Sequence, residues 1–320
     1  MPQASSAPQN SSSLAPLSGK RVVVAGASGF MGQSFVEKFR EDGATVTTVG
    51  RSGSDVSWGD EAGLAAAIDG SDILVNLAGK SVNCRYTTKN RNAIFSSRLL
   101  TTAELGRAVE AAAVPPALWF NASTATIYRH ADDRPMTDED GEIGNGFSVN
   151  VATAWEREFF AHHRPGVRQI ALRMAIVLGD GSALAPLLML TRLGLGGTQF
   201  GGKTRGGRQR FSWIHIDDVY RSIRFLAEKT AIDGPVNISA PNPVENRELM
   251  KTLRRVLRMP FGLPVNRAML EVGSFAIRSE TELLLKSRWV VPTRLEAAGF
   301  EFEHPVLEEA VRDIVTSARH

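Results

Sequence analysis

The sequence predicts an α/β protein: a doubly wound parallel sheet with helices on both faces, followed by a smaller, mostly helical C-terminal region. Short runs of β-branched and other apolar residues alternate with helix-like segments through the first half of the chain, which is the order typical of a parallel sheet. A glycine-rich turn joins the first apolar run to the first helix-like segment. The chain has 320 residues, of which 43% are hydrophobic, and this is enough apolar material for such a core.

The individual elements follow from the lengths of the runs and from the residues at their boundaries. Apolar runs of five or six residues favour strands over buried helices, and Gly43 directly after a helix-like segment is typical of a helix end. A late run, PVNIS, predicts a strand near 235–240 that returns to the sheet. The expected strands are 21–25, 45–49, 73–77, 117–122 and 169–178, and the expected helices are 31–42, 64–68, 91–113, 148–163, 217–229 and 246–258.

The turn after the first strand has the form of a phosphate-binding loop. The segment VVVAGASGFMGQSF places Gly26, Gly29 and Gly32 between a strand and a helix. Glycines let the backbone turn tightly and approach a pyrophosphate, and free N–H groups at the helix N-terminus bind the phosphates. The alternating context favours a dinucleotide site of the Rossmann type over simple helix–strand packing. Further contacts are expected from Ser28, Phe30 and Met31.

The end of the second strand predicts which dinucleotide binds. An acidic residue there would accept a hydrogen bond from the ribose of NAD, whereas this chain has Arg51, whose guanidinium can pair with the 2′-phosphate of NADP. Ser28 and Ser52 offer additional hydroxyl donors. We therefore expect NADP as the cofactor, with NAD as the second choice. Two alternatives stay open: Arg51 is a solvated surface residue, or Asp55 folds back toward the ribose.

The glycine spacing, G-x-x-G-x-x-G with Phe30 after the second glycine, resembles that of the extended short-chain dehydrogenase/reductases, which include the nucleotide-sugar epimerases and dehydratases. Three further segments resemble motifs of that family: NLAG at 76–79, ASTATIY at 122–128 and WIHIDDV at 213–219. Residues 287–311 resemble the C-terminal domain of an epimerase-like branch. The resemblance implies cofactor contacts from Leu77, Ala78, Gly79, Arg98, Ala122 and Ser123.

These observations divide the chain into three parts. Residues 1–18 are rich in Ser, Pro, Gln and Ala and are expected to be a disordered tail, without the basic start and apolar core typical of a signal peptide. Residues 19–178 are expected to form an NADP-binding Rossmann domain, which the late strand near 235–240 completes. Residues 179–320 are then the substrate-binding and C-terminal region.

The usual catalytic pair of the resembling family is missing. That pair is Tyr-x-x-x-Lys on the helix after strand five, where the tyrosine exchanges a proton with the substrate and the lysine lowers its pKa. Here the two positions fall on Ser148 and Ala152, and the chain contains no Tyr-x-x-x-Lys. The candidate replacements are Thr124, Tyr86 and Ser148, with His130 as a further titratable group.

Substrate contacts are expected from the region after the glycine-rich stretch at 194–207. Arg210 belongs to a basic cluster there, and Trp213 and His215 lie on the apolar run that follows. Each has an ordinary alternative, because Arg210 can be a solvated loop residue and Trp213 and His215 can be strand core.

Composition narrows the class of function. The net charge of +3 is spread along the chain, which disfavours nucleic-acid binding. No run of about 18 apolar residues predicts a membrane span. Cys84 is the single cysteine, which excludes an intrachain disulfide and a cysteine-based metal site, and we expect no bound metal. The expected protein is cytoplasmic, is a monomer or homodimer, and acts on a small molecule.

Two functions of different classes fit these features. The first is an NADP-dependent oxidoreductase of the epimerase/dehydratase type that acts on an unidentified carbonyl, alcohol or nucleotide-linked substrate. The second is a non-catalytic NADP-binding sensor or scaffold, which the missing Tyr/Lys pair favours. A strict nucleotide-sugar epimerase is a weaker third hypothesis, because hydride must leave and return under good acid–base control. A catalytic acid within reach of the nicotinamide would distinguish the enzyme from the sensor.

Overall fold

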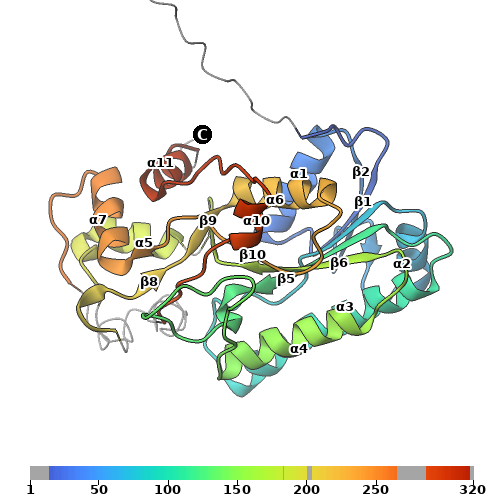
Figure 1. Ribbon diagram of the computed structural model, residues 1–320, viewed down its shortest axis with the longest axis horizontal. Coiled ribbons are helices and arrows are strands. Elements are labelled where there is room, and N and C mark those ends of the chain that lie inside the picture. Colours follow the sequence, from blue (N-terminus) through green and yellow to red (C-terminus); the bar gives the residue numbers. More distant parts are fainter. Residues whose placement is uncertain (1–13, 183, 200–203, 265–285, 318–320) are drawn as a thin grey trace, which may run out of the picture.

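The computed structural model describes residues 14–182, 184–199, 204–264 and 286–317 (Figure 1). Its centre is a seven-stranded sheet in the order β10–β6–β5–β4–β1–β2–β3, in which all neighbouring strands are parallel. The chain winds outward in two directions from the β1–β4 pair, which confirms the predicted doubly wound α/β fold. The strands are β1 (Arg21–Ala25), β2 (Thr45–Gly50), β3 (Val56–Ser57), β4 (Ile73–Asn76), β5 (Leu118–Thr124), β6 (Arg168–Met174) and β10 (Gly234–Ile238).

Helices cover both faces of the sheet, because successive side chains of each strand point to opposite faces. Val22 and Val24 of β1 belong to one core cluster with side chains of α1 and α6. Val23 and Ala25 belong to the opposite cluster, with side chains of α2, α3 and α4. All four are at most 1% exposed. The covering helices are α1 (Phe30–Glu41), α2 (Glu61–Ile68), α3 (Thr88–Ala111), α4 (Phe147–Ala161) and α6 (Ile216–Glu228).

The C-terminal region packs beside one end of this sheet (Figure 1). It is mostly helical, as expected, but it also contains two small ladders: β7 (Ile176–Leu178) with β9 (Trp213–His215), which are parallel, and β8 (Arg210–Phe211) with β11 (Val244–Glu245), which are antiparallel. A third core cluster joins these ladders to the helices. The helical elements are α5 (Leu184–Leu190), η2 (Thr191–Leu195), η3 (Arg205–Gly207), α7 (Asn246–Val256), α10 (Thr293–Ala297) and α11 (Leu307–Ser317), and a short 3-10 turn, η1 (Ala125–Ile127), follows β5.

Two sequence-based boundaries need correction. The single strand expected over 169–178 is two strands, β6 and β7, because the chain leaves the main sheet at Ala175 and β7 pairs with β9 instead. Of the tail expected over 1–18, residues 1–13 lie outside the described residues. Leu17, by contrast, is 8% exposed and belongs to the core cluster with α1, and its N–H donates to the carbonyl of Asp42 at 2.9 Å. Leu17 is therefore part of the folded core and not of a tail.

Within the described ranges, no helix combines the length and the apolarity that crossing a membrane requires.

Candidate functional site

The glycine turn between β1 and α1 is shaped by close backbone contacts. Gly26 has a φ of +81°, and a Cβ at this position would lie 2.8 Å from the amide nitrogen of Ala78. A Cβ at Gly32 would lie 2.3 Å from the carbonyl oxygen of Gly26. Gly29 is the N-cap of α1 and supplies no side-chain cap. The first N–H groups of α1 therefore face outward from the turn, in the arrangement that binds phosphate.

A cavity of about 420 Å³ opens beside this turn, at the carboxyl ends of β1, β4 and β5. The strand order reverses between β1 and β4, and ligands of doubly wound sheets bind at such a reversal. Most of the predicted site residues line the cavity: Gly26, Gly29, Phe30, Met31, Gly32, Leu77, Ala78, Gly79, Tyr86, Arg98, Ala122, Ser123, Thr124 and Ser148. Six predicted residues do not line it: Ser28, Arg51, Ser52, Arg210, Trp213 and His215.

A buried asparagine at the end of β4 fixes the segment that forms one wall of the cavity. The amide nitrogen of the Asn76 side chain donates to Oδ1 of Asn121 at 2.7 Å and to Oγ1 of Thr102 at 3.1 Å. Its side-chain oxygen accepts a hydrogen bond from the backbone N–H of Ala78 at 3.0 Å. Asn76 is fully buried, so these bonds fix the chain where Ala78 approaches the glycine turn.

Tyr86 and Arg98 enter the cavity from the β4–α3 loop and from α3. The ring of Tyr86 packs edge-on against Phe147, with ring centroids 5.1 Å apart. The guanidinium of Arg98 lies 4.9 Å from the ring centroid of Trp155 and donates to the carbonyl oxygen of Lys80 at 3.0 Å. Burial lowers the pKa of Arg98 to about 10, and its electrostatic interaction with Tyr86 opposes that shift. The tyrosine phenol and a half-buried cation therefore interact in one cavity.

Ser148 lies in the first turn of α4 and has unsatisfied hydrogen-bonding capacity. Its Oγ is buried and has no hydrogen-bond partner among the described residues. Thr124, by contrast, already uses its Oγ1 to accept the N–H of Thr126 at 3.1 Å. A buried hydroxyl without a partner costs free energy unless a ligand or water completes its bonding. Ser148 therefore suits a role in holding a polar ligand.

A buried polar network supports the floor of the cavity behind Ser123. Its Oγ donates to Oε1 of Glu156 at 2.6 Å, and Arg173 binds both oxygens of Glu156, at 2.9 and 2.7 Å. Arg173 also donates to the phenol oxygen of Tyr128 at 3.0 Å, and that phenol donates to Asn237 at 2.7 Å. Burial raises the pKa of Tyr128. This tyrosine is therefore committed to the network and does not line the cavity.

The residues expected to touch the substrate lie elsewhere in the C-terminal region. Trp213 is fully buried in the third core cluster, because β9 pairs with β7 rather than joining the main sheet. His215 packs against His304, with ring centroids 3.9 Å apart. Arg210 is half-buried and its guanidinium lies 4.4 Å from the ring centroid of Trp289. The structure thus separates these three residues from the cavity.

His130 is also tied to other groups. Its Nδ1 accepts the backbone N–H of Ser287 at 3.1 Å, and its Nε2 lies 3.1 Å from Oδ2 of Asp132. It is not among the residues that line the cavity.

The acidic and the basic candidate after β2 differ in their contacts. The carboxylate of Asp55 accepts hydrogen bonds from the N–H and the Oγ1 of Thr48, at 2.8 and 2.7 Å. The hydrogen bonds from Thr48 lower the pKa of Asp55. Arg51 and Ser52 are exposed and directly follow β2, which pairs in register with β1 up to Ala25 and Val49. The carboxylate of Asp55 is therefore bound to β2, and Arg51 directly follows the strand next to β1.

Sequence reasoning missed much of the apolar lining. Met174, at the end of β6, follows from a general rule, because the carboxyl ends of adjacent parallel strands meet at one edge of the sheet. Phe147 carried no such signal, since its role depends on contact with Tyr86. The additional lining residues are Lys80, Ser81, Val82, Ile94, Thr126, Phe147, Val151, Ala152, Trp155, Met174, Ala175 and Val177.

Comparison with known proteins agrees with this geometry. Residues 22–239 match the NAD dependent epimerase/dehydratase family, and residues 267–314 match a domain of unknown function, DUF1731. The chain is 30% identical to the epimerase family protein YfhF of Bacillus subtilis over 93% of this chain and 99% of the relative. It is 32% identical to the human epimerase family protein SDR39U1 over 92% of this chain and 99% of the relative.

Solved structures show the same relationship. The crystal structure of human SDR39U1 (isoform 2) with NADPH matches with a TM-score of 0.81 and 30% identity, covering 92% of this chain and 99% of that one. UDP-glucose 4-epimerase from Thermotoga maritima, at 17% identity, shares the fold with a TM-score of 0.72, covering 93% of this chain and 98% of that one. The resemblance inferred from the glycine spacing and the C-terminal stretch is confirmed. The chain belongs to the NAD dependent epimerase/dehydratase family.

Proposed function

We propose that the protein is an NADP-dependent oxidoreductase that interconverts a carbonyl and an alcohol on a small or nucleotide-linked substrate. One observation carries the proposal: the phosphate-binding turn, a tyrosine, a half-buried arginine and a buried serine hydroxyl without a partner among the described residues all line one cavity of about 420 Å³. The crystal structure of the human relative with NADPH supports the choice of cofactor.

The residues present fit a dinucleotide. A Cβ at Gly26 or Gly32 would clash with the neighbouring backbone, so these glycines permit the tight turn that a pyrophosphate needs. Leu77, Ala78 and Gly79 then form the wall against which the nucleotide lies. When bound, NADP supplies or accepts the hydride.

In this proposal Tyr86 replaces the tyrosine of the missing Tyr-x-x-x-Lys pair. Its phenol exchanges a proton with the substrate oxygen, and Arg98 stabilises the phenolate that remains when the proton has left. The pair comes from the β4–α3 loop and α3 rather than from α4. Ser148 and Thr124 hold the substrate oxygen by hydrogen bonds in positioning roles.

The cofactor preference follows from Arg51. Arg51→Ala is expected to weaken NADPH binding about tenfold or more, because losing a hydrogen bond to a charged group costs about 1.5–3 kcal/mol. NADH binding should be unchanged, since NADH lacks the 2′-phosphate. Fluorescence titration of both cofactors at fixed ionic strength measures this, with the exposed Arg107→Ala as the control. Equal affinity of the native chain for NADH and NADPH would contradict the assignment.

A second candidate function is a non-catalytic NADP-binding sensor or scaffold. The observation that favours it is that Ser148 and Ala152, which face the cavity, are neither tyrosine nor lysine. The two functions share the cofactor and differ in whether hydride reaches a second molecule. Transfer of the hydride, rather than binding of NADPH, is therefore the property that separates them.

A further inference from the structure

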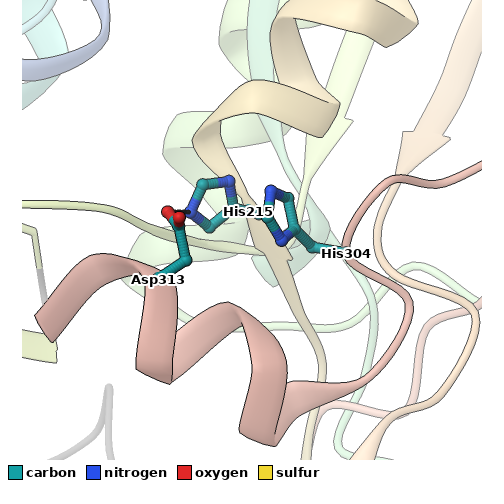
Figure 2. Close-up of side chains that lie close together, drawn as sticks. All are labelled: His215, His304 and Asp313. Carbon is teal, nitrogen blue, oxygen red and sulfur yellow. Dashed lines mark ion pairs between the residues drawn. The ribbon is translucent and has the colours of Figure 1, made fainter. Parts of the chain in front are cut away.

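Three side chains from separate segments meet beside the N-terminus of α6 (Figure 2). His215 ends β9 and is the N-cap of α6, His304 lies in the segment before α11, and Asp313 projects from α11. One ligand atom from each lies within 4.8 Å of the other two. None of the three lines the cofactor cavity, so the cluster is a separate feature of the molecule.

The imidazole of His215 has a buried nitrogen that makes an ion-pair contact but no hydrogen bond among the described residues. The side chain is 3% exposed, and its Nε2 has no hydrogen-bond partner there. The same nitrogen lies 3.4 Å from Oδ2 of Asp313, and the ring stacks at 3.9 Å on that of His304. Burying a nitrogen without a hydrogen bond costs free energy, which a group bound between the two imidazoles and the carboxylate would offset.

Neighbouring groups hold the cluster in position. The buried carboxylate of Asp218 accepts the backbone N–H groups of Glu303 and His304, at 2.8 and 2.9 Å. These bonds fasten the segment that carries His304 onto α6. On the other side of His215, Oδ2 of Asp217 lies 3.7 Å from Nδ1. Nδ1 itself accepts the backbone N–H of Asp217 at 3.3 Å, so Nε2 is the nitrogen that faces Asp313, and it releases its proton when a metal binds there.

We propose that His215, His304 and Asp313 bind one divalent first-row transition metal ion, with Zn²⁺ as the best match. Two imidazoles and one carboxylate are typical zinc ligands, and a water completes a tetrahedral site. Metal–nitrogen bonds of about 2.0–2.1 Å in that geometry place ligand atoms roughly 3.3 Å apart. The ligand atoms lie within 4.8 Å of one another, and Asp313, which is about half exposed, has room to rotate toward the two imidazoles.

The metal would join two parts of the chain. His215 lies within the stretch that matches the epimerase/dehydratase family, and His304 and Asp313 lie within the stretch that matches DUF1731. The ion is therefore structural: it fastens α11 to the end of β9, away from the cofactor cavity. The sequence predicted no metal because its ligands come from distant segments and form no spacing motif.

Zinc titration of the full chain tests the proposal. The protein is stripped with EDTA and desalted, and ZnCl₂ is added in a calorimeter, with MgCl₂ as the comparison. We expect one Zn²⁺ per chain with a Kd of about a micromolar or tighter, and no binding of Mg²⁺. At a free Zn²⁺ concentration of about a hundred times the Kd, zinc should raise the Tm by about 5 °C or more, because it binds the folded state alone.

His304→Phe and Asp313→Asn should each weaken zinc binding at least about tenfold while leaving the Tm in EDTA unchanged, which shows that both variants are folded. His163→Gln, an exposed histidine outside the cluster, should bind zinc as the native chain does. X-ray absorption of the zinc complex should count two imidazole ligands and no sulfur. The proposal is wrong if the native chain does not bind zinc, or if both cluster variants bind it with native affinity. It is also wrong if His163→Gln loses binding, or if the spectrum shows a sulfur ligand from Cys84.

Discussion

Tyr86→Phe should lower the rate of NADPH-dependent carbonyl reduction by about 10²–10⁴-fold, the usual contribution of a positioned general acid. The ring that packs on Phe147 is retained, and only the phenol oxygen is lost. Binding of NADPH should therefore be nearly unchanged. The measurement is NADPH oxidation with a panel of small aldehydes, ketones and nucleotide-linked sugars, together with fluorescence titration of the cofactor.

Tyr220→Phe is the matched control for this change. Tyr220 packs against Phe35 and Phe39 of α1, does not line the cavity, and donates its phenol proton to Asp42. Its loss should lower stability modestly and leave the rate constant unchanged. If Tyr86→Phe retains the native rate, Tyr86 is not the proton donor, and Ser148→Ala then tests whether the serine hydroxyl takes that role.

Glu156→Gln should lower the free energy of unfolding by about 3–5 kcal/mol. Both partners of the Glu156–Arg173 pair are buried, with side-chain exposures of 9% and 12%. Removing one charge leaves the other buried without its counter-charge, which is the costly case for buried ion pairs. Urea denaturation followed by circular dichroism measures the loss as a shift in the midpoint at constant slope.

Two further variants test whether this loss of stability comes from the buried Glu156–Arg173 pair. Glu158→Gln changes a neighbouring carboxylate of the same helix, which bonds His162 at 3.2 Å and is about a third exposed. It should cost at most about 1 kcal/mol. The double variant Glu156→Gln/Arg173→Met should recover part of the loss, because it removes both charges. A loss below about 1 kcal/mol for Glu156→Gln alone would show that the pair is not a buried support of the cavity floor.

The sequence predicts those features that depend on local pattern. Gly26 and Gly32 were identified because the turn needs residues without a Cβ, and the structure shows the clashes that any Cβ there would make. The alternation of strands and helices predicts a parallel sheet that is covered on both faces. In the structure, the side chains of β1 alternate between two buried clusters, one on each face. Arg98 came from the family resemblance, and it lies in the cavity wall.

Features that depend on long-range contacts were missed or misjudged. The break at Ala175 has no local signal, since β7 leaves the sheet to pair with β9 from a distant segment. Trp213 and His215 were expected at the substrate because of their place in a motif, but their burial depends on the C-terminal helices that pack around them. The Glu156–Arg173 pair links α4 to β6, and neither residue alone indicates a buried charge.

Deuterium transfer is the most direct test of the account. The protein is incubated with NADPH that carries deuterium on the transferring face of nicotinamide C4, together with the carbonyl panel, and the products are examined by mass spectrometry. The account predicts one deuterium on the carbinol carbon of a product, formed by the native chain and lost in Tyr86→Phe. Tight binding of NADPH with no deuterium in any product would contradict the oxidoreductase and leave the NADP-binding sensor as the function.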